Sequence, residues 1–230
     1  MPGLPTPSAV LLDLDGTLVD TVAARIAGWR AAYGGIGIEL TEDDLGPQIG
    51  RDGVALAVEL ATRSGRALDD AAARALDADA GRRFDQLAAT RAALPGARAL
   101  LEALDAAGVP WAIATSSAPD QVVASVAAVG LATPPRVVDG SHVQRAKPAP
   151  DLLLLGAQQL GVDPARCWYV GDSTWDMRAA VAAGMVPVAV LAGSAVDEPT
   201  LREAGAAAVV PTLAEVMGLH PALAAHNRTV

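Results

Sequence analysis

The sequence predicts an α/β protein: a doubly wound parallel sheet of the Rossmann-like kind, with an all-helical domain inserted into it. Three observations lead to this prediction. Residues 9–13 form a short apolar run near the start of the chain. After residue 95, short apolar segments alternate with amphipathic ones, a pattern typical of parallel strands joined by helices on both faces of a sheet. Residues 20–92, between these two regions, contain no convincing strand.

Each strand of the predicted sheet is brief, apolar and bounded by turn residues. The first is expected at residues 9–13. The others are expected at residues 109–115, 136–140, 166–172, 185–191 and 206–210. Helical segments are expected at residues 96–107, 118–129, 149–160, 173–183 and 197–204. Because the helices connect successive strands, the strands should run parallel.

The insertion at residues 20–92 is rich in Ala, Leu and Arg, and its apolar positions recur periodically. Glycines interrupt it at several points, which suggests several helices joined by turns. We therefore expect a separate helical domain at residues 20–92. Residues 1–19 and 93–230 are expected to form the α/β core domain.

The composition limits the partners and the compartment. The chain has 230 residues, of which 52% are hydrophobic, and a formal net charge of -9. An acidic balance argues against nucleic acid or an anionic membrane as partner. The one cysteine, Cys167, permits no internal disulfide, and no basic region precedes the first apolar run as a signal peptide would require. We expect a cytoplasmic protein, and we expect it to be a monomer or a homodimer.

Polar side chains stand at four predicted strand ends, where open α/β sheets bind their ligands. They are Asp13 and Asp15, then Thr115 with Ser116, then Lys147 beyond the third strand, and finally Asp172 and Asp176. Four carboxylates cannot all remain ionised at close range without a cation. Carboxylate oxygens suit Mg²⁺, which is often held together with a substrate phosphate. The pattern therefore predicts a site for Mg²⁺ and a phosphate.

The remaining strand-end residues are candidates for binding that phosphate. Thr115 or Ser116 could supply a hydroxyl, and the helix expected after them would add backbone N–H groups at its positive end. Lys147 would supply a compact positive charge. It is the single lysine among 17 basic residues.

Four short motifs carry a resemblance to a known family. In chain order they are DLDGT, TSS, KPAPD and GDSTWD. Together they resemble the motifs of the haloacid dehalogenase superfamily over residues 9–190, in particular the subgroup of phosphoglycolate phosphatases and β-phosphoglucomutases. The helical insertion is similar to the cap of that subgroup.

The resemblance implies a role for each motif residue. Asp13 would be the nucleophile that forms an aspartyl-phosphate, and Asp15 the general acid and base. Lys147 and Thr115 or Ser116 would bind the phosphoryl group. Mg²⁺ would be held by the Asp13 carboxylate, the Asp15 backbone carbonyl and Asp172, while Asp176 would either ligate through water or orient Lys147.

The implied activity is a Mg²⁺-dependent phosphatase for a small phosphomonoester, either a sugar phosphate or a molecule like phosphoglycolate. Arg51, on a glycine-rich loop of the insertion, resembles a cap position that meets the substrate in sugar-phosphate members. A sugar-phosphate mutase is the alternative, because it would share every core motif. A non-catalytic phosphate-binding protein is a third possibility, although it would have no need of a proton shuttle such as Asp15.

Overall fold

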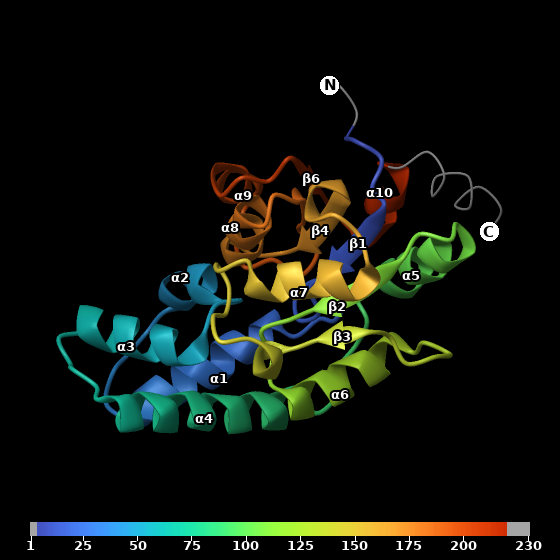
Figure 1. Ribbon diagram of the computed structural model, residues 1–230. Helices are drawn as coiled ribbons and strands as arrows, with labels where there is room; N and C mark the ends of the chain where they lie inside the picture. Colours follow the sequence, from blue (N-terminus) through green and yellow to red (C-terminus); the bar gives the residue numbers. More distant parts are fainter. Residues whose placement is uncertain (1–3, 220–230) are drawn as a thin grey trace.

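The computed structural model describes residues 4–219 and contains a six-stranded parallel sheet with the strand order β3-β2-β1-β4-β5-β6 (Figure 1). Residues 1–3 and 220–230, which the sequence assigned to the core domain, lie outside the described residues. The strands are β1 Ala9–Leu12, β2 Trp111–Ala114, β3 Val137–Val138, β4 Cys167–Gly171, β5 Val186–Val190 and β6 Ala208–Val210. The predicted fold class is confirmed.

Helices cover both faces of this sheet. They are α5 Ala97–Ala106, α6 Pro119–Val129, α7 Asp151–Leu160, α8 Thr174–Ala182, α9 Glu198–Glu203 and α10 Leu213–Gly218, with 3-10 turns η2 Gly140–His142 and η3 Pro164–Arg166. Helices α5, α6 and α10 pack on one face, against Val10 and Leu12 of β1. Helices α7 and α8 pack on the other face, against Ala9 and Leu11. Alternate residues of β1 thus bury opposite faces, as the pleat of a strand requires.

The insertion is helical, as predicted, and has its own hydrophobic core. It contains α1 Val22–Gly35, α2 Glu42–Leu45, η1 Gly46–Gln48, α3 Gly53–Arg63 and α4 Asp70–Leu87. Trp29, Tyr33, Leu56, Leu60 and Leu76 are among the residues of its core. In Figure 1, α1, α3 and α4 lie below α7 and α8, and α2 lies beside α7. The exact limits of the two domains stay a prediction.

The fold brings the insertion over the carboxyl ends of the central strands. β1 pairs with both β2 and β4, so the residues that follow these three strands lie next to one another. Within residues 4–219, no helix is both long and apolar enough to cross a membrane.

Candidate active site

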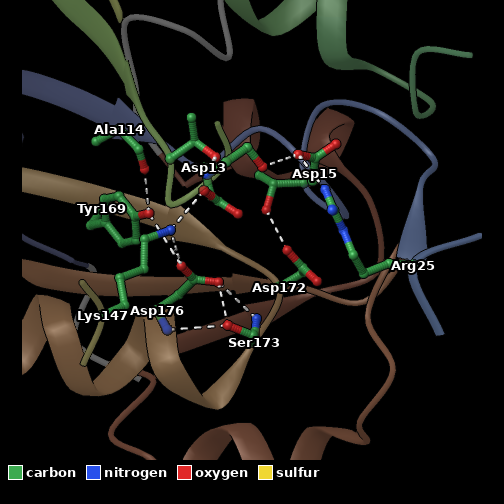
Figure 2. Close-up of polar contacts among 12 residues, drawn as sticks. Asp13, Asp15, Arg25, Ala114, Lys147, Tyr169, Asp172, Ser173 and Asp176 are labelled. Atoms are coloured by element: carbon green, nitrogen blue, oxygen red, sulfur yellow. Dashed lines mark hydrogen bonds and ion pairs between the residues drawn. The ribbon is translucent and has the colours of Figure 1, made fainter. Parts of the chain in front are cut away.

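Lys147 lies buried between two carboxylates that come from different parts of the fold. Its Nζ is 2.6 Å from Oδ1 of Asp13, directly after β1, and 2.7 Å from Oδ1 of Asp176, in the first turn of α8 (Figure 2). Lys147 and Asp13 are only 2% and 4% exposed, and Asp176 is fully buried. The three side chains therefore form a charged group that water barely reaches.

Asp176 is held by hydrogen bonds to both of its oxygens. Oδ2 accepts one from the backbone N–H of Ser173 at 3.0 Å and one from the Ser173 hydroxyl at 2.6 Å, and this arrangement caps α8. Oδ1 faces the Tyr169 hydroxyl at 3.2 Å in addition to Lys147. Because these contacts fix the Asp176 carboxylate, it fixes the position of the Lys147 ammonium in turn.

Three of the four predicted carboxylates converge. One oxygen from each of Asp13, Asp172 and Asp176 lies within 4.8 Å of the others. Asp172 follows β4, and its Oδ1 accepts a hydrogen bond from the Thr17 hydroxyl at 2.8 Å. Asp15 does not belong to this group, so the expectation that four carboxylates would meet at one point is wrong for Asp15.

The Asp15 carboxylate is turned towards the hydroxyls and the arginine beside it. Oδ1 accepts hydrogen bonds from Thr21 at 2.9 Å and from Ser125 at 3.1 Å, and Oδ2 accepts one from Ser117. Arg25 of α1 lies 3.5 Å from Oδ2, and Figure 2 shows Asp15 on the Arg25 side of the site.

The backbone after Asp15 explains how this arrangement is possible. Gly16 has a φ of 81°, a conformation that side-chain-bearing residues rarely adopt. A Cβ at this position would also lie only 2.3 Å from Oδ2 of Asp172. Glycine is therefore required where the chain turns tightly against Asp172.

The site carries more negative charge than Lys147 can balance. Burial raises the pKa of Asp13 to about 7, although Lys147 opposes that shift. Burial also raises the pKa of Asp172 well above its ordinary value, and Asp176 and Asp13 add to the shift. Burial alone would lower the pKa of Lys147, but Asp13 and Asp176 outweigh it and raise that pKa. A group of three buried oxygen ligands with excess negative charge fits a divalent cation.

The two predicted phosphate-binding hydroxyls follow β2. Thr115 is buried, and its Oγ1 accepts a hydrogen bond from the backbone N–H of Ser117 at 3.2 Å. The hydroxyl of Ser116 is also buried, and within residues 4–219 it has no hydrogen-bond partner. A buried polar group without a partner is costly, so Ser116 offers a free hydroxyl to a ligand.

A cavity of about 630 Å³ lies between the core and the helical insertion. From the core it is lined by Asp13, Asp15, Thr115, Ser116 and Lys147. The insertion contributes the opposite wall, which includes Arg25, Trp29 and Arg51. The predicted cap residue Arg51 thus faces the same cavity as the strand-end residues.

Arg51 is also bound to neighbouring side chains. Its Nη1 donates to Oε1 of Gln48 at 2.8 Å and forms an ion pair with Glu59. Its guanidinium lies over the ring of Trp175, 4.5 Å from the centroid. Arg51 therefore joins α3 of the insertion to α8 of the core.

Several residues of the site were not predicted from the sequence. Thr17 and Ser117 lie within the DLDGT and TSS motifs, and this position was the available signal. Arg25 and Ser125 lie on α1 and α6, outside the motifs. No local pattern marks them, because the tertiary fold brings α1 of the insertion and α6 of the core to Asp15.

Comparison with known proteins identifies the family. Residues 7–184 match the family model described as haloacid dehalogenase-like hydrolase. The chain belongs to the haloacid dehalogenase-like hydrolases. The resemblance inferred from the four motifs is thereby confirmed. Members of this family generally use a divalent metal ion, which agrees with the excess negative charge around Asp13 and Asp172.

Individual relatives cover most of the chain. Hexitol phosphatase A of Escherichia coli (strain K12) is 36% identical over 197 residues, which are 84% of this chain and 86% of that protein. Phosphoglycolate phosphatase of Xanthomonas campestris pv. campestris (strain 8004) is 36% identical over 193 residues, with 81% and 84% covered. The crystal structure of a hydrolase from Pseudomonas syringae superimposes with a TM-score of 0.86 at 32% identity, covering 91% of this chain and 96% of that chain.

Proposed function

We propose that this haloacid dehalogenase-like hydrolase is a Mg²⁺-dependent phosphatase that hydrolyses a small phosphomonoester through an aspartyl-phosphate on Asp13. The observation that carries the proposal is the buried group of Asp13, Lys147, Asp172 and Asp176, of which Asp13 and Lys147 line the cavity. The family and the printed names of the two phosphatase relatives support the same activity.

In the first step, a carboxylate oxygen of Asp13 attacks the phosphorus atom, and the bond from phosphorus to the ester oxygen breaks. The departing alkoxide takes a proton from the Asp15 carboxyl, which acts as general acid. Both residues line the same cavity, in which the ester bond would lie.

In the second step, Asp15 accepts a proton from a water molecule as that water attacks the phosphorus atom. The bond between phosphorus and Asp13 breaks, inorganic phosphate leaves, and both carboxyl groups return to their starting states. Dividing one displacement into two easier ones is the advantage of covalent catalysis. The hydroxyls of Thr21, Ser117 and Ser125 hold Asp15 in place between the two steps.

The other residues would stabilise charge on the phosphoryl group. Lys147 lies within contact distance of the nucleophile and could pair with a phosphoryl oxygen. The free hydroxyl of Ser116 favours it over Thr115 as the main hydroxyl donor. The contacts of Asp176 with Lys147 and Ser173 favour the role of orienting Lys147 over that of ligating a metal through water.

Mg²⁺ is the cation that this ligand set suits best, because hard oxygen ligands and a substrate phosphate are its usual partners. Asp13 and Asp172 would hold it, together with the backbone carbonyl of Asp15. When bound, the ion supplies positive charge that keeps Asp13 ionised and polarises the phosphoryl oxygens.

A sugar-phosphate mutase is the second candidate, because it would use the same core residues. A mutase must hold a second phosphate while its intermediate turns over, which requires available cations on the cap. Arg51, which lines the cavity there, is already engaged by Glu59. This pairing favours the phosphatase.

Two measurements test the proposed function. Purified protein with Mg²⁺ should hydrolyse a generic aryl phosphate, and a chelator should stop the reaction. Trapping with Mg²⁺ and beryllium fluoride should place the beryllium fluoride adduct on Asp13. The Asp13→Asn variant should neither hydrolyse the substrate nor form the adduct. Turnover that a chelator does not stop, or a beryllium fluoride adduct on Asp15 or Asp172, would contradict the proposed function.

We also propose that the protein is cytoplasmic and that it is a monomer or a homodimer.

A further inference from the structure

The cavity has much more room than the phosphoryl site needs. Its volume of about 630 Å³ is in the range of pockets that accept drug-sized ligands. With the phosphoryl group at Asp13 and Lys147, the alcohol part of the substrate must extend towards the insertion. The chemistry of that wall therefore selects the alcohol.

Apart from Lys147 at the phosphoryl site, the basic side chains of the cavity lining are all paired with carboxylates of the protein. Within the part of the chain that the structure describes, every lysine or arginine of the lining lies close to a carboxylate. The pairs are Arg25 with Asp15, Arg51 with Glu59, Arg82 with Asp79, and Lys147 with Asp13. A carboxylate or a second phosphate on the substrate would have to compete with these protein carboxylates.

The same wall carries carboxylates that lack a cation. Asp52 and Asp77 both line the cavity, and neither forms an ion pair within residues 4–219. Asp77, on α4, is half-buried, and burial together with the charge of Asp52 raises its pKa. Gly53 permits its close approach, since a Cβ there would lie 2.0 Å from Oδ1 of Asp77. This part of the wall repels anions and accepts hydrogen bonds.

Two amides supply the complementary donors. Oε1 of Gln48 accepts from Arg51 at 2.8 Å, and Oε1 of Gln121 accepts from Arg25 at 3.1 Å. These bonds leave the side-chain N–H groups of both glutamines available as donors at the cavity surface. As far as residues 4–219 are concerned, the lining thus offers both hydrogen-bond acceptors and donors, but no unpaired cation.

We propose that the substrate is the phosphomonoester of a polyhydroxylated molecule without a further negative charge, that is, a sugar or sugar-alcohol phosphate. Hydroxyl groups can donate to Asp52 and Asp77 and accept from Gln48 and Gln121. A second anionic group would instead face carboxylates and cations that are already paired, which is unfavourable. The inference rests on the proposed phosphatase activity, but it makes a separate claim about the leaving group.

The test compares two substrates that differ only in that second charge. Sorbitol 6-phosphate and 6-phosphogluconate share their phosphate and hydroxyl groups, but the latter carries a carboxylate in place of the terminal CH₂OH. We expect kcat/KM to be at least ~10-fold higher for sorbitol 6-phosphate, since like charges brought together oppose binding. Phosphoglycolate should be a poor substrate for the same reason.

A pair of variants assigns the discrimination to the wall. Asp77→Asn removes a carboxylate from the cavity, so the ratio of the two kcat/KM values should fall by about threefold, the scale of one partly exposed charge. Asp43→Asn is the control, because Asp43 is an exposed acidic residue of the insertion that does not line the cavity. It should leave the ratio unchanged.

The outcomes separate the two proposals. Equal or faster turnover of 6-phosphogluconate or phosphoglycolate, with aryl phosphate still hydrolysed, overturns the inference and leaves the phosphatase proposal standing. If aryl phosphate is not hydrolysed at all, the phosphatase proposal fails. Binding of the two sugar phosphates, measured by calorimetry, then decides the inference: tighter binding of sorbitol 6-phosphate supports it, and equal or weaker binding overturns it.

Discussion

At the scale of single residues, the charge of Lys147 is needed for the stability of the fold as well as for the proposed chemistry. The ammonium lies between Asp13 and Asp176, all three being buried. Removing one partner from such a group leaves the others uncompensated, which typically costs about 3–5 kcal/mol. We expect Lys147→Met to lower the free energy of unfolding of the metal-free protein by roughly this amount, as measured by urea denaturation.

Arg145→Met is the matched control for that experiment. Arg145 lies in the same loop, is exposed, and forms an ion pair with Asp151 at the surface. Its substitution should change the stability by less than about 0.5 kcal/mol. If both variants were equally stable, the buried charge would have no structural role.

Asp13 should make the metal-free protein less stable at alkaline pH. Burial raises the pKa of Asp13 to about 7, whereas the unfolded chain has the ordinary value near 3.8. Between pH 6 and 8 the folded state therefore binds more protons than the unfolded state, so stability falls as pH rises. One such group accounts for about 1.4 kcal/mol over this interval.

Thermal unfolding in the presence of a chelator, at pH 6 and pH 8, measures this effect. Asp13→Asn removes the titrating group, so the difference between the two pH values should shrink. Added Mg²⁺ should also remove the destabilisation at pH 8, because binding favours ionised Asp13. An unchanged pH dependence in Asp13→Asn would show that another group is responsible.

The motif residues could be predicted from the sequence because they follow short apolar strands, and the alternating pattern reveals where those strands lie along the chain. Asp13, Lys147, Asp172 and Asp176 meet because parallel strands end at the same edge of the sheet. The direction of the Asp15 carboxylate could not be predicted. It depends on the φ of Gly16 and on partners supplied by two helices, α1 and α6, of which α6 lies far away in the sequence.

At the scale of secondary structure elements, the contact between η1, α3 and α8 connects the insertion with the core. Nε1 of Trp175 donates to the carbonyl of Pro47 at 2.9 Å, and Arg51 lies over the same indole ring. Trp175→Ala should loosen this connection and admit water to the cavity. We expect kcat/KM to fall by about tenfold for aryl phosphate as well as for larger substrates, since shielding from water affects both.

Trp175→Phe keeps an aromatic ring below Arg51 but removes the indole N–H, so it should have an intermediate effect. Steady-state kinetics with aryl phosphate and with a larger substrate distinguishes a loss of shielding from water from a loss of substrate contact. A loss confined to the larger substrate would mean that Trp175 binds the alcohol and does not shield the site.

The predicted strands and helices are present, although several begin or end at other residues than predicted, and one helix was not predicted. All six strands are found, but β3 contains only Val137 and Val138, because it lies at the edge of the sheet with a single neighbour. Helix α10 was not predicted. It has six residues, and it is buried through Leu213, Val216 and Met217, which pack against α5 and the sheet. The alternating pattern predicts helices between strands, and no strand follows α10 within residues 4–219, so its structure depends on tertiary packing.

At the scale of the whole molecule, the insertion and the sheet have separate hydrophobic cores and meet around the cavity through polar and aromatic contacts. Substrate must enter between them, and water must be excluded while the aspartyl-phosphate forms. A cap that moves relative to the core would satisfy both requirements. The structure offers a position at which that motion can be blocked.

Gly46 of η1 and Ala195, in the loop after β5, suit an engineered disulfide. A Cβ on Gly46 would lie 3.4 Å from the Cβ of Ala195, close to the separation found in disulfides. The φ of Gly46 is −49°, which a cysteine adopts readily. The native Cys167 is buried in β4 and should not interfere.

In the oxidised Gly46→Cys/Ala195→Cys variant, the insertion should be tied to the core, and turnover of a sugar phosphate should fall by at least about tenfold. A reductant should restore the turnover. The turnover of the single variant Gly46→Cys should change neither on oxidation nor on reduction. Mass spectrometry establishes that the disulfide has formed. If the fully oxidised protein turned over substrate as fast as the reduced protein, movement of the cap would not be needed for substrate to enter, and the cavity would have to be open to substrate in the structure as it stands.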